Sequence, residues 1–108
     1  MPTYLVQASY TSEAIASLIK NPQNRMEVVA KAGQNLGGKL IGGWMSFGEY
    51  DVVLIAELPD QVSAAAIALA AAAGGSLKAI KTTPLLTAEE GIEAAKKAAA
   101  SGYTPVAK

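Results

Sequence analysis

The sequence contains no histidine and no cysteine, and its only arginine is Arg25. Without histidine there can be no Ser-His-Asp triad, no histidine-ligated zinc and no haem on a proximal histidine. Without cysteine there is no disulfide, no thiolate metal site and no cysteine nucleophile. We therefore predict neither a metal nor a cofactor. Any acid–base chemistry would use carboxylates, lysine, tyrosine or the N-terminal amine.

The chain also has no net charge, because nine basic residues balance nine acidic ones. Its lysines are scattered, whereas a nucleic-acid-binding protein normally carries a basic stripe, so we predict no nucleic-acid partner. The first ten residues lack the basic region of a signal peptide. The alanine-rich residues 62–73 are too few to cross a bilayer, which takes roughly 20 apolar residues. With the absence of cysteine, these features predict a soluble cytoplasmic protein without a membrane partner.

The residues that are present describe one globular domain. The chain has 108 residues, of which 51% are hydrophobic and 17% charged. We assign residues 1–101 to a single domain and residues 102–108 to a C-terminal tail, which could reach a neighbouring subunit.

Short apolar runs alternate with helical patterns and turn residues along this domain. The predicted strands span residues 4–10, 39–47, 50–58 and 76–83. The predicted helices span residues 11–36, 61–73 and 87–100, the first as one helix or two collinear pieces with Pro22 in the first turn of the second. This βαββαβ order predicts an α+β ferredoxin-like fold, an antiparallel four-stranded sheet with helices on one face and an added C-terminal helix.

Three pairs of residues predict local backbone geometry within that fold. Gly37 and Gly38 are typical of a left-handed helix end. Gly42 and Gly43, inside a strand, indicate a bulge or a close approach of two backbones. Gly48 and Glu49 form a hairpin turn in which Gly48 supplies a positive φ angle.

The third strand separates into two faces of different character. Its residues 52, 54, 56 and 58 are all apolar and should lie under the helices, whereas residues 51, 53, 55 and 57 form a mixed face. Leu5, Val53 and Ile55 leave this second face too apolar for open solvent. We therefore predict a homodimer in which two sheets meet face to face as a dimeric α/β barrel. Larger assemblies through Trp44 or the C-terminal helix are a further expectation.

The segment Gly48-Glu49-Tyr50-Asp51-Val52-Val53 follows Gly37-Gly38-Lys39-Leu40 and precedes Glu57-Leu58-Pro59-Asp60. In this order it resembles the GYD domain family, which is named after a Gly-x-Tyr-Asp signature at the start of this strand. The similarity covers roughly residues 1–93, including the alanine-rich helix and the threonine-containing last strand. It implies a small bacterial or archaeal protein of the dimeric α/β-barrel group, with no settled biochemical role to carry over.

Asp51 is the strongest candidate for a catalytic or ligand-binding residue. Period two directs its carboxylate towards the mixed face, where a partner sheet would desolvate it and favour acid–base chemistry. Gln7 and Ser9 share that face and could line a cavity with Asp51, or pair across the dimer. Tyr50 points the opposite way and could bind a ligand, although an aromatic residue at the core edge is the simpler interpretation.

Two other features have structural interpretations. Trp44, the only tryptophan, is assigned to an interface rather than to a ligand platform. The glycines of residues 33–43 end a helix and enter a strand, the reverse of a dinucleotide-binding loop, so they do not predict phosphate binding.

Three functions remain open from the sequence. The first is a binding or assembly protein without catalysis, to which the lack of histidine, cysteine and a second arginine points. The second is a cofactor-free enzyme that uses Asp51 on a small molecule in a cavity between the sheets. The third is a tautomerase with Pro2 as the N-terminal base, although the scattered cations offer little to hold an anionic substrate.

Overall fold

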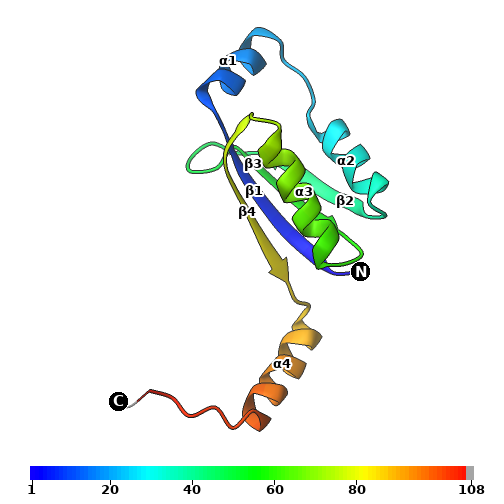
Figure 1. Ribbon diagram of the computed structural model, residues 1–108, viewed down its shortest axis with the longest axis vertical. Coiled ribbons are helices and arrows are strands. Elements are labelled where there is room, and N and C mark those ends of the chain that lie inside the picture. Colours follow the sequence, from blue (N-terminus) through cyan, green and yellow to red (C-terminus); the bar gives the residue numbers. More distant parts are fainter. Residues whose placement is uncertain (107–108) are drawn as a thin grey trace.

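The computed structural model describes residues 1–106, and its order of elements confirms the predicted α+β ferredoxin-like fold. The strands are β1 (Thr3–Tyr10), β2 (Lys39–Met45), β3 (Val52–Glu57) and β4 (Leu77–Leu85). The helices are α1 (Ser12–Lys20), α2 (Met26–Asn35), α3 (Gln61–Ala73) and α4 (Ala88–Ala100). Figure 1 shows the four strands as one sheet, with α4 lying well away from it.

The sheet is antiparallel throughout, with the strand order β2-β3-β1-β4. β4 is an edge strand and runs to Leu85, two residues beyond the predicted end at Thr83. Pro84 lies opposite Tyr4 inside the ladder. An edge strand tolerates proline because it has one side without a ladder partner. Pro84 therefore lies within β4 and not after it, where the predicted bounds had placed it.

One prediction about the helices was wrong. Residues 11–36 do not form collinear helical pieces joined at Pro22, because α1 ends at Lys20 and α2 starts only at Met26. The backbone N–H of Met26 donates to Oδ1 of Asn24, 3.0 Å away, so the asparagine rather than Pro22 shapes the start of α2. The two helices point in different directions and leave a bridging segment, residues 21–25, between them (Figure 1).

Side-chain caps begin three of the helices. Thr11 accepts the N–H of Ala14, and Asp60 accepts the N–H of Ser63 at 2.8 Å. This backbone hydrogen bond holds the pKa of the Asp60 carboxyl below its usual value. At α4, Thr87 and Glu90 form a capping box, in which each side chain accepts the other's backbone N–H.

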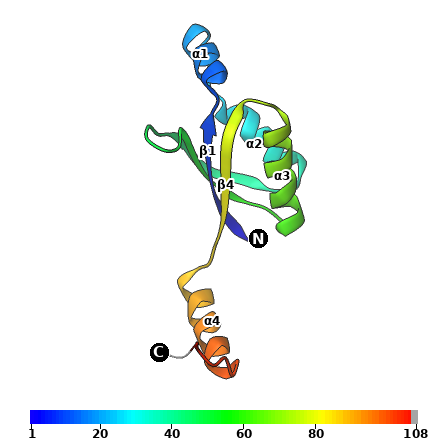
Figure 2. The same ribbon diagram turned by 60° about the vertical axis from the view of Figure 1, so that its left-hand side comes forward.

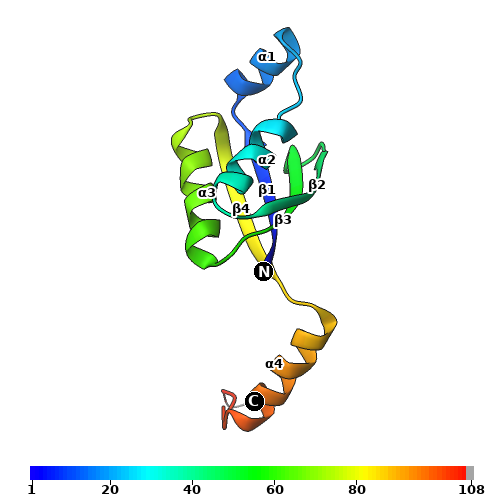
Figure 3. The ribbon, with the colours of Figure 1, turned by 90° about the vertical axis from the view of Figure 1, so that its right-hand side faces the viewer.

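The core lies between the sheet and the helices α2 and α3, which cover the same face (Figure 2, Figure 3). Its most buried residues come from alternating positions of β1 and β3, from the turn after β3 and from α3: Tyr4, Val6, Val52, Leu54, Leu58 and Ala64. This confirms the apolar face predicted for the third strand. Period two in these strands decided which side of the sheet the helices cover.

The predicted glycine geometry is confirmed at the turns and at the bulge. Gly37 has a φ of 81° at the end of α2, and Gly48 has a φ of 148° in the hairpin. The register of β2 against β3 shifts between Leu40 and Gly42, which is the expected irregularity. A side chain at Gly43 would collide with the sulfur of Met26, so this glycine lets α2 lie directly on β2.

The helix α4 has no close packing partner among the described residues. It follows β4 as an arm that carries the C-terminal end of the chain away from the sheet (Figure 1, Figure 3). Its exposed apolar side chains include Ile92, 59% exposed. Of the predicted tail 102–108, the last two residues lie outside the described part of the chain. Across residues 1–106, no helix combines the length and apolarity needed to span a bilayer.

Candidate functional site

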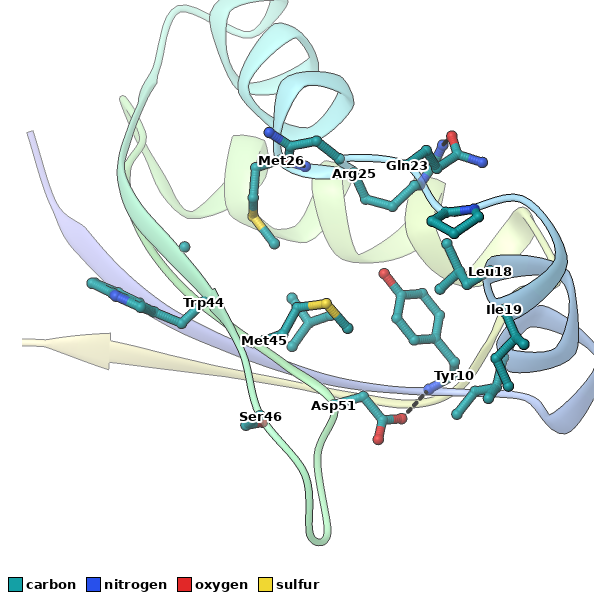
Figure 4. A pocket seen from close by; sticks show the side chains of 15 residues that line it. Tyr10, Leu18, Ile19, Gln23, Arg25, Met26, Trp44, Met45, Ser46 and Asp51 are labelled. Carbon is teal, nitrogen blue, oxygen red and sulfur yellow. Dashed lines mark hydrogen bonds between the residues drawn. The ribbon is translucent and has the colours of Figure 1, made fainter.

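A cavity of about 460 Å³ opens at the end of the sheet where α1 and α2 meet it. Its walls come from the end of β1, from α1, from the bridging segment 21–25, from the start of α2 and from the facing ends of β2 and β3. Figure 4 shows Tyr10 in the middle of this space, with Leu18 and Ile19 on one side and Met26 and Met45 on the other. The volume is within the range of small-molecule sites, roughly 300–1,000 Å³.

The break between α1 and α2 makes this space. Because α1 ends at Lys20 and the chain then turns through Pro22, the sheet end where Tyr10 projects is not covered by any helix of the described chain, residues 1–106. Gly43 meanwhile brings α2 so close to β2 that Met26 forms a wall of the cavity. The side chains that line the cavity are mainly apolar. The polar ones are Tyr10, Gln23, Asn24, Arg25, Ser46 and Asp51.

Asp51 lies in the wall of this cavity, at the residue before β3 begins. Its Oδ2 accepts the backbone N–H of Tyr10 at 2.9 Å, and its own N–H donates to the carbonyl of Ala8 at 2.8 Å (Figure 4). The carboxylate therefore fastens the hairpin to the end of β1. Whether a partner sheet also covers it stays a prediction.

The structure does not gather the other candidate residues around Asp51 in one site. Gln7 is half-buried in the middle of β1. Ser9 is buried, and its hydroxyl donates to the carbonyl of Glu49 at 2.6 Å. Tyr50 offers its carbonyl to the hydroxyl of Ser46, also at 2.6 Å. Ser9, Ser46 and Asp51 thus hold the hairpin of residues 46–51 in place.

We expect Asp51→Ala to lower the free energy of unfolding by roughly 1–2 kcal/mol, because a charge-assisted hydrogen bond to a half-buried N–H is lost. Asp51→Asn keeps an acceptor oxygen and should cost clearly less. Urea unfolding followed by circular dichroism would measure both. Glu49→Ala is the matched control, since it removes an exposed carboxylate from the same turn. Equal stability of the alanine and wild-type proteins would refute the structural role of Asp51.

Within residues 1–106, no helix covers the opposite face of the sheet (Figure 2). In the register of the ladders, Leu5 lies between Ile55 and Thr83, and Gln7 lies between Val53 and Lys81. Trp44 pairs with Val53 and shares this face, where its ring lies over Gly42 and is 56% exposed. This face, here called the open sheet face, is therefore apolar in its centre, with charged residues around it.

A second hollow surrounds the N-terminus, where β1 and β4 end and the chain turns into α4. Pro2 lies there with the carboxylates of Glu57 and Glu90, and none of the lining residues within 1–106 is a lysine or an arginine. An anionic substrate would be repelled by the two carboxylates beside this proline. The surroundings of Pro2 thus favour neither the tautomerase chemistry nor its substrate class.

The sequence reasoning missed two features. The first is the cavity beside Tyr10, for which the signal was the Asn-Pro pair that separates α1 from α2. The second is the outer side of α3, where every fourth or third residue is apolar and exposed: Val62, Ala65, Leu69 and Ala72. Val62 is 78% and Leu69 70% exposed. Surface helices usually have a polar outer side, so a helix that is apolar all round indicates a second contact surface.

The comparison with family models decides the classification of the chain, since the model of the GYD domain matches residues 4–95. The chain belongs to the GYD domain family. The match runs from β1 into α4 and ends five residues before that helix does. The Gly-x-Tyr-Asp residues of this GYD domain thus lie in the hairpin that Ser9 and Asp51 connect to β1.

Two proteins similar to this GYD domain come from Thermus thermophilus. A "Glutamine synthetase and cystathionine beta-lyase binding protein" is 31% identical over 78 residues, which are 72% of this chain and 82% of the relative. The crystal structure of the protein TTHA0845 superposes with a TM-score of 0.52 at 16% identity, over 82% of this chain and 96% of that chain. This second likeness supports the fold alone.

Proposed function

We propose that this GYD domain is a non-catalytic binding protein that acts as a homodimer and docks onto an enzyme. The observation that carries the proposal is the pair of exposed apolar surfaces, one on the open sheet face and one on the outer side of α3. The two surfaces lie on opposite sides of the protomer, because α3 covers the other face of the sheet (Figure 2). One can therefore pair subunits while the other stays available for a partner.

The open sheet face suits a second copy of the same chain. Its apolar centre, formed by Leu5, Val53 and Ile55, would be buried against the same residues of the partner under two-fold symmetry. Lys81 and Glu57 lie towards opposite ends of this face, so each charge can meet its opposite across such an interface. Apolar centres with a charged rim are typical of protein interfaces.

The outer side of α3 suits another protein because it has no charged residue from Gln61 to Ala73. Four exposed residues form an apolar stripe on this side, the α3 stripe: Val62, Ala65, Leu69 and Ala72. Its two large side chains, Val62 and Leu69, lie two helical turns apart. The relative from Thermus thermophilus is named for binding two enzymes. We propose that this GYD domain likewise binds glutamine synthetase or cystathionine beta-lyase, with the α3 stripe as the contact.

We expect Leu69→Lys to weaken binding to the enzyme at least tenfold, because it places a charge in the centre of the apolar contact. Surface plasmon resonance with purified glutamine synthetase and cystathionine beta-lyase, each immobilised separately, would measure the dissociation constants. Ala70→Lys adds the same charge at an exposed position of the same helix outside the stripe and should leave binding within twofold. Binding that is absent from the wild type, or that is equal in wild type and Leu69→Lys, would contradict the proposed contact.

The cofactor-free enzyme is supported by one observation, the presence of the Asp51 carboxylate in the wall of the cavity. Against it stands the hydrogen bond from the Tyr10 N–H, which gives that carboxylate a structural role. We therefore rank catalysis by Asp51 second.

A further inference from the structure

The residues at the centre of the proposed dimer face (Leu5, Val53 and Ile55) and those of the α3 contact do not line the cavity beside Tyr10, which shares Trp44 with the open sheet face. The cavity opens on the side of the sheet that carries the helices, at the end where α1 and α2 meet, whereas the dimer would use the other face. A space of about 460 Å³ with mainly apolar walls lies in direct reach of solvent there. Exposed apolar side chains form much of these walls, since Ile19 is 76% and Met45 73% exposed. Such a concave apolar surface favours an apolar ligand.

Two polar groups at one side of the cavity define what the ligand must carry. The hydroxyl of Tyr10 points into the space, towards the bridging segment that holds Arg25 (Figure 4). The guanidinium of Arg25 makes one long hydrogen bond of 3.4 Å to Oε1 of Gln23. Among residues 1–106 no carboxylate lies within ion-pair distance of Arg25. Its remaining N–H groups are therefore available, and a guanidinium binds carboxylates with two parallel hydrogen bonds.

The electrostatic setting points to an anion at this side. Arg25 is the residue before α2, so the positive end of the α2 dipole lies beside it. Asp51 lies in a different wall of the cavity, at the residue before β3. A negatively charged head group is thus attracted to Arg25 and repelled from Asp51, which would orient the molecule in the cavity.

We propose that this cavity binds a small apolar monocarboxylate. The carboxylate would accept hydrogen bonds from Arg25 and from the Tyr10 hydroxyl, and the hydrocarbon part would lie against Leu18, Met26 and Met45. Met26 and Met45 are flexible side chains that adapt to hydrocarbon chains of different shape. This inference goes beyond the proposed function and does not depend on either protein interface.

Hexanoate is the probe, and 1-hexanol is its uncharged counterpart. In NMR titrations we expect hexanoate to shift the methyl signals of Met26 and Met45 and the amide signal of Gly43, with roughly millimolar affinity or tighter. Affinity should rise about fourfold for each added methylene from butanoate upwards until the cavity is full. 1-Hexanol should bind about tenfold more weakly than hexanoate.

Two substitutions separate the charge from the apolar walls. Arg25→Gln should weaken hexanoate about tenfold and leave 1-hexanol unchanged, because it removes only the charged donor. Tyr10→Phe keeps the ring and should weaken hexanoate by a smaller factor. Lys31→Gln is the matched control, since it removes an exposed positive charge elsewhere on α2. It should leave both ligands unaffected.

Three outcomes would overturn the proposal. The first is the absence of saturable shifts at Met26, Met45 and Gly43 with any acid of the series. The second is equal affinity for hexanoate and 1-hexanol. The third is an equal loss of hexanoate affinity in Arg25→Gln and Lys31→Gln, because the loss would then follow from the net charge of the protein and not from a contact with Arg25. Because Arg25 is exposed, Arg25→Gln should change ligand affinity without destabilising the fold.

Discussion

Ile55→Lys is expected to prevent formation of the proposed dimer and leave the protein monomeric. Ile55 lies opposite Leu5 in the centre of the open sheet face. In a two-fold interface each substitution occurs twice, so two lysine ammonium groups would be buried close to the symmetry axis. The free energy needed to remove these charges from water exceeds the stabilisation that the remaining apolar contacts provide. Static light scattering across a concentration series would give the molar mass.

The control for this experiment is Val62→Lys, which places the same charge on the exposed outer side of α3. It should keep the dimer mass, because α3 covers the face opposite to the proposed interface. Circular dichroism should show both variants folded, since Ile55 is half-buried in the protomer and outside the core cluster. A monomeric wild type, or an Ile55→Lys protein that stays dimeric, would refute pairing through this face.

Gly38→Ala is expected to destabilise the protomer by roughly 1–3 kcal/mol or more, as overpacking does. A methyl group at Gly38 would collide with the backbone carbonyl of Glu57 and lie 2.6 Å from Cδ2 of Leu58. Leu58 is among the most buried side chains of the core, at 3% exposure, so it has little room to move. The start of β2 would have to shift away from the end of β3. Urea or thermal unfolding would measure the change.

Gly33→Ala provides the matched control, because it adds the same methyl group five residues earlier. Gly33 lies in the interior of α2, and an added Cβ would have no neighbour within 4 Å. Alanine there should stabilise the protein by about 0.5–1 kcal/mol through its better helix propensity. Opposite signs for the two substitutions are expected. Equal effects would show that the tight contact at Gly38 does not limit stability.

The two faces of the sheet were predictable from sequence because they follow from strand period alone. Val52 and Leu54 alternate with Val53 and Ile55, so the two pairs must lie on opposite faces of the sheet. The wholly apolar set that contains Val52 and Leu54 is the one that lies under the helices. The roles of Gly37 and Gly48 were also predictable, because both adopt positive φ angles that other residues avoid. Both signals are local.

The cavity could not be predicted because it arises from tertiary geometry. Asn21 and Pro22 indicate an interruption of the helix, but not the distance over which the chain stays non-helical or the direction of α2 afterwards. The position of Asp51 was equally inaccessible, because strict alternation applies inside a strand and Asp51 precedes β3. There its hydrogen bond to Tyr10 decides the orientation of the carboxylate.

The arm formed by α4 changes how a protomer moves through solution. The radius of gyration is 17.2 Å, whereas a compact chain of this length has about 13 Å, and the longest axis measures 56 Å against 22 Å for the shortest. A single protomer therefore has the frictional drag of a larger compact protein and will leave a gel-filtration column early. Small-angle X-ray scattering should record the arm as a tail of long interatomic distances in the pair-distance distribution.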